Sequence, residues 1–194
     1  QLNLPVYVLN DVRAATWGEW LYGAGRGCDH FVCLFIGTGI GSGIVINGSV
    51  FEGSSNAGGE VGHMVIDLHG PHCNCGQRGC FEAIAGGLAI GRRAQEVVAY
   101  DPAGGSMLVE LAGGNVKDIA ATHVFAAYAK GLPLAKKIVD EAREGLIAGV
   151  VSVASIINPA LIVLGGGIMQ GMPSFLGDVQ REVPKRTLKA IEDH

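Results

Sequence analysis

Short apolar runs alternate with longer segments of mixed character along this chain, and most of the short runs lie in its first third. The run at 31–36 has no polar residue and the length of a strand, which predicts a buried strand. Residues 44–51 predict two more strands, because the Asn47-Gly48 pair between them is favoured in a type I′ hairpin turn. Residues 5–9 predict a shorter strand at the start.

The rest of the chain is mainly helical in pattern. An early helix is predicted at 12–22, because Asn10 and Asp11 stand where an N-cap belongs. Strands that cluster early and return late among helices, without a repeat or a linker, predict one α/β domain. The further helices are predicted at 85–100, 118–130, 134–157 and 175–182, with short strands at 64–66 and 161–164 and loops at 53–62 and 69–80.

One uncharged segment, 145–169, is long enough to span a bilayer. Asn158-Pro159 interrupts it and three glycines follow, so a buried helix, a turn and a buried strand explain it better than a membrane span. The first nine residues lack the basic start and apolar centre of a signal peptide. We therefore expect no membrane contact.

Composition narrows the function classes. The chain has 48% hydrophobic and 16% charged residues, a balance typical of a folded domain rather than a disordered one. Its formal charge is −4 and no run of Lys and Arg is present, which disfavours nucleic-acid binding by this segment. Glycine is about twice as frequent as usual, with 31 residues, so particular backbone positions require it.

Three of the five cysteines lie close together in a C-x-C-x4-C pattern formed by Cys73, Cys75 and Cys80. The odd total and the clustering favour metal-binding thiolates in a cytosolic protein over a disulfide framework. Gly76 and Gly79 supply positions that tolerate positive φ, which a loop needs in order to bring three sulfurs to one ion. Ordinary buried cysteines are the alternative, and they would not explain clustering in a polar, glycine-rich loop.

A fourth ligand would complete a closed tetrahedral zinc site, and a closed site is structural rather than catalytic. Three histidines precede the cysteines, and spacing alone does not choose among them: His63, His69 and His72.

Two glycine-rich segments follow apolar strands. The first, 37–43, lets backbone N–H groups approach an anion closely, although a glycine-rich hairpin would look similar. It departs from the Walker pattern because no Lys-Ser/Thr pair follows it. The second, 165–167, ends a predicted strand, where ligands often bind; a plain tight turn is the alternative.

Several acidic residues stand beside these motifs. Asp11 could accept a proton from an attacking hydroxyl, although a helix cap is the plainer interpretation. Glu60 and His63 lie three residues apart in a loop, and Glu82 follows the last cysteine by two. Solvated carboxylates and a chance histidine are the alternative.

Taken in order, these five features resemble the ROK family, which includes bacterial glucokinases and sugar-responsive repressors. The order spans residues 10–167: Asn10-Asp11, the G-T-G-x-G-x-G turn, G-E-x-G-H at 59–63, C-x-C-G-x-x-G-C-x-E at 73–82, and the strand with its glycine triplet. The resemblance implies an α/β fold of the actin-like, hexokinase-like (ribonuclease H-like) ATPase type, with a mixed sheet, flanking helices and a zinc-bearing loop.

The resemblance also implies a role for each matching residue. Asp11 matches the catalytic base. The residues of this chain that match the family's sugar contacts are Asn10, Glu60, His63 and Glu82. Those that match its structural zinc ligands are His63, Cys73, Cys75 and Cys80. Those that match the segments holding ATP with Mg²⁺ are Gly37, Thr38, Gly39, Gly41, Gly165, Gly166 and Gly167.

The chain departs from the family pattern in three respects. No Asp-x-Gly-x-Thr turn precedes residue 1, and the sequence stops before a segment that would return to a small domain. We therefore expect 1–194 to be a single large domain, without the small N-terminal domain and the C-terminal return segment. Arg13 stands where related kinases often have a second Asn, which points to helix packing or a rim contact.

The expected function is ATP-dependent phosphorylation of a hexose, as in glucokinases, by a cytoplasmic homodimer. The dimer is expected from the uncharged helical surface around 145–157 and from the family. One alternative is the sugar-binding domain of a ROK-type repressor, which would not need both glycine segments. Another is a zinc-stapled scaffold without a ligand.

Overall fold

A mixed four-stranded sheet forms one end of the molecule. The computed structural model describes residue 4 and residues 9–189, so the strand predicted at 5–9 lies almost wholly outside the described residues. The strands lie in the order β3-β2-β1-β4, with β1 antiparallel to β2 and parallel to β4. Their bounds are β1 Phe31–Ile36, β2 Ile40–Ile46, β3 Ser49–Val50 and β4 Leu161–Gly165.

The apolar character of β1 is explained by burial of both of its faces. Val32, Leu34 and Ile36 belong to the main hydrophobic core with the helices, whereas Phe31 and Cys33 join a second cluster on the opposite face. Successive side chains of a strand point to opposite faces, so a strand buried on both sides needs an unbroken apolar run.

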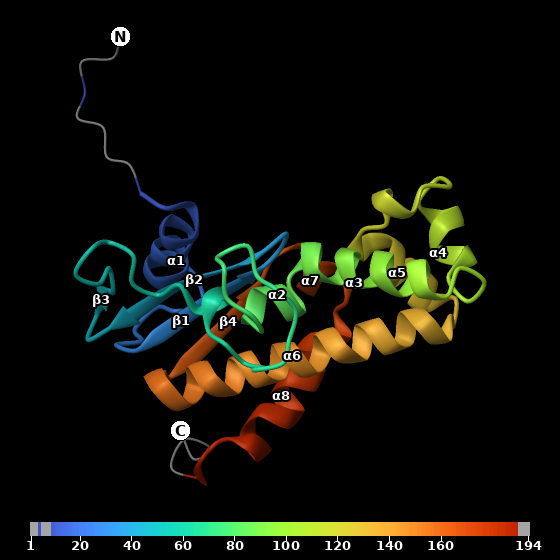
Figure 1. Ribbon diagram of the computed structural model, residues 1–194. Coiled ribbons are helices and arrows are strands. Elements are labelled where there is room, and N and C mark those ends of the chain that lie inside the picture. The colour runs from blue at the N-terminus through green and yellow to red at the C-terminus, as the bar shows by residue number, and fades with distance from the viewer. Residues whose placement is uncertain (1–3, 5–8, 190–194) are drawn as a thin grey trace.

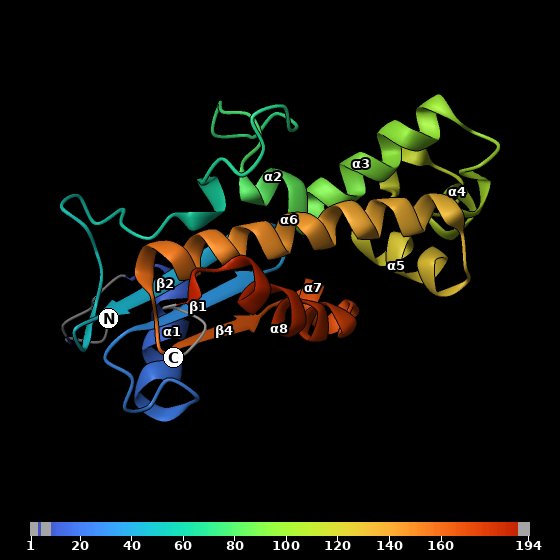
Figure 2. The same cartoon turned by 90° about the horizontal axis from the view of Figure 1, so that it is seen from below.

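Helices cover both faces of the sheet. The long helix α6 (Pro133–Ile157) passes on one side, and α1 (Asp11–Tyr22) packs on β2 from the other (Figure 1). Seen from below, α8 lies beside α6 and a group of helices extends beyond the sheet along the far half of α6 (Figure 2). The remaining helices are α2 Phe81–Ala85, α3 Gly87–Tyr100, α4 Ser106–Leu111, α5 Ala121–Ala129, α7 Gly167–Gly171 and α8 Ser174–Arg186.

The hairpin prediction is confirmed. Asn47 and Gly48 both have positive φ, 51° and 65°, as a type I′ turn requires. Because β2 already begins at Ile40, only residues 37–39 of the glycine-rich segment 37–43 form the turn between β1 and β2.

The single helix predicted at 85–100 is wrong at its start. The chain is helical from Phe81, breaks at Gly86 and resumes at Gly87 as α3. The break is explained by hydrogen bonds to the first glycine segment, since the Gly87 N–H donates to Gly37 O (2.8 Å) and the Leu88 N–H to Thr38 O (3.0 Å).

The strand predicted at 64–66 is also wrong. Val65 forms only an isolated bridge with Cys80, because this segment pairs with a short irregular loop and not with the sheet. The predicted loop at 53–62 ends in a 3-10 turn at Val61–His63, and the helix predicted from 118 starts at Ala121 after another 3-10 turn, Val116–Asp118.

Two short helices, α4 and α7, were not predicted, since neither has the length that makes an apolar pattern readable. The uncharged segment 145–169 forms a helix, a turn and a strand, as predicted. The helix α6 ends at Ile157, Asn158 takes a left-handed conformation with φ 47°, and β4 follows. Within the described residues, no helix is both long and apolar enough to cross a membrane.

Candidate active site and metal centre

The cysteine loop folds back on itself before α2. Cys73 N donates to Gln77 O (2.8 Å) and Gly79 N to Pro71 O (2.8 Å), which closes a narrow turn around Gly76. Gly76 and Gly79 have φ of 93° and 68°, as the sequence predicted for this loop. The fold-back brings the three sulfurs to one place.

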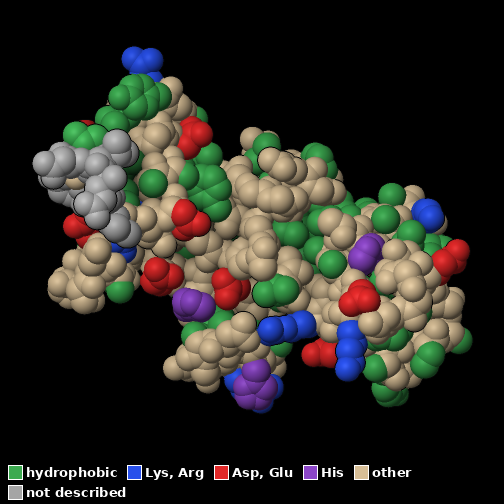
Figure 3. All heavy atoms as spheres, turned by 90° about the horizontal axis from the view of Figure 1, so that it is seen from above, with side chains coloured by type: hydrophobic (Ala, Val, Ile, Leu, Met, Phe, Trp, Pro, Cys, Tyr) green, Lys and Arg blue, Asp and Glu red, His purple; other side chains and the backbone are tan. Residues whose placement is uncertain are grey.

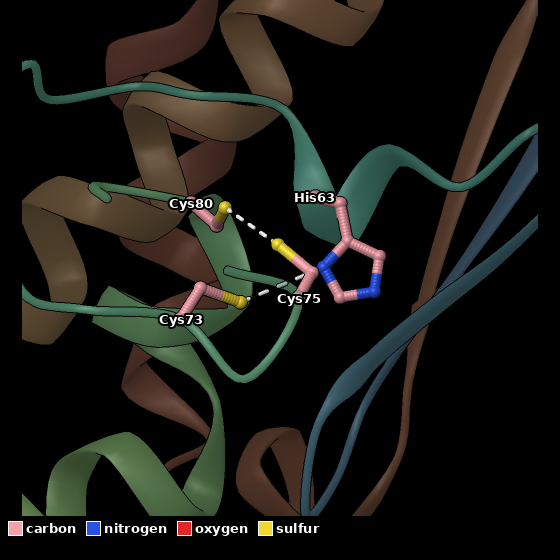
Figure 4. Close-up of side chains that lie close together, drawn as sticks. All are labelled: His63, Cys73, Cys75 and Cys80. Atoms are coloured by element: carbon pink, nitrogen blue, oxygen red, sulfur yellow. Dashed lines mark hydrogen bonds between the residues drawn. The ribbon is translucent and has the colours of Figure 1, made fainter. Parts of the chain in front are cut away.

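His63 is the histidine that joins the cysteines. One ligand atom from each of His63, Cys73, Cys75 and Cys80 lies within 4.8 Å of every other, whereas His69 and His72 lie outside the group. In Figure 4 the His63 ring directs Nδ1 toward Cys73, at 3.6 Å from its Sγ, and its other nitrogen away from the sulfurs. The choice that the spacing left open is therefore made by the fold.

These distances suit a tetrahedral zinc ion. With Zn–S bonds of about 2.3 Å and a Zn–N bond of about 2.0 Å, tetrahedral geometry separates two sulfurs by about 3.8 Å and a sulfur from the nitrogen by about 3.5 Å. The Cys75 and Cys80 sulfurs lie 3.6 Å apart, as do Cys73 Sγ and His63 Nδ1. The cluster is compatible with structural zinc, and its four protein ligands would leave no open position.

The pKa values of the Cys80 and Cys75 thiols are shifted in opposite directions. Burial, and then the neighbouring thiols of Cys75 and Cys73, raise the pKa of Cys80 to about 12. Hydrogen bonding, above all from the backbone of Gln77, lowers the pKa of the exposed Cys75. A metal ion binds thiolates, so it must displace the Cys80 proton, and zinc affinity is expected to rise with pH.

The two glycine segments lie side by side. Because β1 and β4 are parallel, with Phe35 opposite Gly165, their carboxyl ends meet at one edge of the sheet. Residues 37–39 leave β1 there, and residues 165–167 leave β4 and lead into α7. Ligands of α/β sheets bind at such edges.

Three other predicted segments converge on the first two residues of β2. Glu82 Oε2 accepts a hydrogen bond from the Ile40 N–H at 2.9 Å. Gly62, in the G-E-x-G-H segment, packs so closely on Ile40 O that no side chain would fit there. On Gly41, a Cβ would lie 2.6 Å from the Val12 side chain at the start of α1. The start of α1, the Glu60 segment and the cysteine loop thus meet beside the glycine turn.

Asn10 and Asp11 have different roles at the start of α1. Asn10 is the N-cap, and its Oδ1 accepts from the N–H groups of Val12 and Arg13, each at 3.1 Å. Asp11 is the first helical residue, and its exposed carboxylate accepts only from Val12 N (2.9 Å) among the described residues. Asp11 is therefore not the residue that caps the helix.

Glu60 is exposed and precedes the 3-10 turn that carries His63. Figure 3 shows acidic side chains gathered with a histidine on the face seen from above, toward the α1 end of the molecule. An exposed carboxylate and a ring nitrogen that faces away from the sulfurs are both able to hydrogen-bond the hydroxyls of a ligand.

A groove of about 980 Å³ touches part of this site. Thr38, Gly39 and Glu82 line it, together with residues of the cysteine loop and of the helices α3 and α6. Asp11 and Glu60 do not line this groove.

Two contributions to the site were not predicted. Gly86 and Gly87 bring the α2–α3 junction onto Gly37; the adjacent glycines inside a helical pattern were the available signal. Arg13, assigned from sequence to packing or to the rim, is buried and bonds to the loop that precedes Glu60.

Known proteins similar to this chain include both kinases and repressors. A model of the ROK family matches residues 1–194. A glucokinase of Thermotoga maritima is 39% identical over 178 residues, covering 92% of this chain and 55% of the glucokinase. A xylose repressor of Bacillus spizizenii is 30% identical over 189 residues, covering 96% of this chain and 44% of the repressor.

The fold agrees with these sequence matches. A ROK family glucokinase from Streptomyces griseus, solved in complex with glucose and AMPPNP, superposes with a TM-score of 0.81 at 33% identity, covering 96% of this chain and 60% of that one. The chain thus spans little more than half the length of its kinase relatives and slightly less than half that of the repressor.

Proposed function

Because this chain belongs to the ROK family, we propose that the protein is an ATP-dependent hexose kinase of the glucokinase type. It transfers the γ-phosphoryl group of ATP to a sugar hydroxyl, and the 6-hydroxyl of glucose or a related hexose is the acceptor. The chain supplies the larger of two domains, in keeping with its coverage of 55% of the Thermotoga glucokinase.

One observation carries the proposal: the predicted base, sugar and nucleotide segments meet at Ile40 and Gly41. Val12 packs on Gly41, Gly62 packs on Ile40 O, and Glu82 binds Ile40 N. Phosphoryl transfer depends mainly on positioning and charge stabilisation, so a kinase needs its acceptor and its nucleotide to be held against a common element. The first residues of β2 are such an element.

The reacting groups are assigned as follows. Asp11 orients the sugar hydroxyl and accepts its proton as the oxygen attacks the γ-phosphorus and ADP leaves. Asn10, Glu60, His63 and Glu82 bind the other hydroxyls. The nucleotide is held by Gly37, Thr38, Gly39 and Gly41 at β1 and β2 and by Gly165, Gly166 and Gly167 at β4, and Mg²⁺ bound with ATP neutralises phosphate charge.

We also propose that His63, Cys73, Cys75 and Cys80 hold a structural zinc ion. Cys80 immediately precedes α2, whose first turn carries Glu82, and His63 closes the turn that Glu60 begins. Fixing these four ligands therefore fixes the two proposed sugar-binding carboxylates relative to each other.

Replacing Glu60 with Gln is expected to weaken glucose binding by the full-length protein at least tenfold, because a charge-assisted hydrogen bond is lost. Isothermal titration calorimetry measures the change. Glu52→Gln, at an exposed acid in the same loop region, is the matched control and should bind glucose normally. Unchanged affinity in Glu60→Gln would remove Glu60 from the sugar site.

The second candidate is a sugar-binding domain of a transcriptional repressor, favoured by the match to the xylose repressor over 96% of this chain. Such a domain would use the metal loop and the sugar contacts without transferring phosphate. Glucose binding without any ATP-dependent formation of a sugar phosphate would favour the repressor. Steady turnover would favour the kinase.

We further propose a cytoplasmic homodimer. The cytoplasm suits free thiols and an ATP-dependent reaction. Most apolar residues of α6 are buried within the chain. The proposal of a dimer is therefore supported by the apolar side chains that stay exposed near the end of α6, such as Ile156 at 71% exposure, and by the frequency of twofold-symmetric dimers among soluble oligomers. Light scattering of the full-length protein is expected to give twice the monomer mass, and a monomer mass at high concentration would contradict the dimer.

A further inference from the structure

Arg13 is a buried cation that pairs with no carboxylate in the described part of the chain. Its side chain is only 4% exposed, and it takes part in none of the ion pairs found among the described residues. Burying a charge costs several kcal/mol unless other groups replace its hydration. An apolar residue would pack α1 at lower cost, so simple packing does not explain an arginine here.

The guanidinium is instead hydrogen-bonded to one loop. Nη2 donates to the backbone oxygens of Asn56 (2.8 Å) and Gly58 (3.1 Å), and Nη1 donates to the side-chain oxygen of Asn56. Asn56 has φ 59°, the left-handed region in which asparagine is tolerated better than most residues. The loop is thus shaped to present its oxygens to the two ends of a planar fork.

This loop has few other attachments. Residues 51–57 are exposed and contain no regular element, and Ser42 Oγ donates a hydrogen bond to Gly59 O at the end of the loop. A segment with few buried contacts opens easily. Arg13 and Ser42 are therefore the side chains that anchor the loop ahead of Glu60.

The bonds join two parts of the proposed site. Arg13 lies two residues after Asp11 on the first turn of α1, and its acceptor Gly58 lies two residues before Glu60. We infer that Arg13 is a positioning residue that holds the Glu60 segment at a fixed place relative to Asp11. It acts through the loop and does not itself touch the sugar; the sugar-binding part of this inference rests on the proposed function.

The fork geometry makes Arg13→Lys the diagnostic variant. Lysine keeps the positive charge, but its single ammonium nitrogen does not reproduce the two fixed nitrogens through which the guanidinium bonds its three acceptors. In the full-length protein, the amide hydrogen of Gly58, which donates to Glu52 O (2.7 Å) across the loop, is expected to exchange at least tenfold faster in Arg13→Lys, with β1 and α6 unchanged. Arg26→Lys, at an exposed arginine after α1, is the control and should leave exchange in the loop unchanged. Unchanged exchange in Arg13→Lys would overturn the inference.

A double-variant cycle tests whether Arg13 acts through Glu60. Arg13→Lys is expected to weaken glucose binding about tenfold, as a displaced contact does, with AMPPNP affinity within about twofold. Combining it with Glu60→Gln should weaken glucose binding no further than Glu60→Gln alone. Additive losses, or a parallel loss of glucose and AMPPNP affinity together with the melting temperature, would show a merely structural role and overturn the inference.

Two further results keep the inference separate from the proposed function. If the unmodified protein binds no hexose, the proposed function fails, and faster exchange of the Gly58 amide, with β1 and α6 unchanged, still upholds Arg13 as the anchor of the loop. If Arg13→Lys does not fold, Asn56→Gly removes one acceptor, retains the backbone conformation, and is expected to give a smaller change of the same kind. No change in exchange or glucose affinity in that variant would overturn the inference.

Discussion

Replacing Asp11 with Asn is expected to lower the kcat of the full-length protein by a factor of about 10² to 10⁴, the usual contribution of a positioned general base. Glucose affinity should change little, because the amide keeps the size and an oxygen of the carboxylate. Coupled measurement of ADP release gives kcat, and calorimetry gives the affinity.

Stability separates this role from helix capping. Asn10 is the cap of α1, so Asp11→Asn removes only a favourable charge at the helix start, worth about 0.3–1 kcal/mol. For a domain of this size the melting temperature should fall by a few degrees at most. A large loss of stability would mean that the carboxylate is structural.

The control is Asp29→Asn, at an exposed acid in the loop before β1. It makes the same chemical change away from the proposed site, so kcat should remain that of the unmodified protein. If Asp11→Asn retains turnover within a few-fold, Asp11 is not the base. The repressor candidate would then be favoured.

The division of roles between Asn10 and Asp11 shows what sequence reasoning could achieve. The pattern placed both residues at a helix start, and the structure confirms that start within one residue. It could not say which residue caps, because both side chains are good N-caps. The answer depends on backbone angles at the junction, and it leaves Asp11 exposed.

Local features were predicted well, and features that join distant segments were not. The cysteine pattern is contained within eight residues, and β1 is fixed by its own apolar run, so both were readable. The fourth metal ligand depends on where His63 packs, and the break at Gly86 depends on bonds to Gly37. Such contacts join residues ten to fifty positions apart, which no local pattern records.

The glycines of the first segment show a further limit. The resemblance matched Gly37, Gly39 and Gly41 to the nucleotide site, but Gly41 also gives α1 close access to β2, through Val12. One residue type satisfies both demands, so composition and spacing do not distinguish them. Gly41 in the nucleotide site stays a prediction.

Replacing Cys75 with Ser is expected to lower the melting temperature of the metal-loaded protein by roughly 8–16 °C. Cys75 is exposed, so the substitution itself costs little packing, and its effect passes almost wholly through the metal. A ligand at a thousandfold excess over its Kd stabilises a fold by about 4 kcal/mol. Each kcal/mol corresponds to about 2–4 °C in a domain of this size.

Chelation provides the matching experiment. Removing zinc should lower the melting temperature of the unmodified protein to that of Cys75→Ser and leave the variant almost unchanged, because both changes abolish the same binding energy. Cys28→Ser, at a half-buried thiol outside the cluster, should respond to the chelator as the unmodified protein does. Elemental analysis should find one zinc per chain. A structural metal would be excluded if no zinc is found, or if the chelator does not change the melting temperature of the unmodified protein. The protein alone would then hold α2 and Glu82 in place.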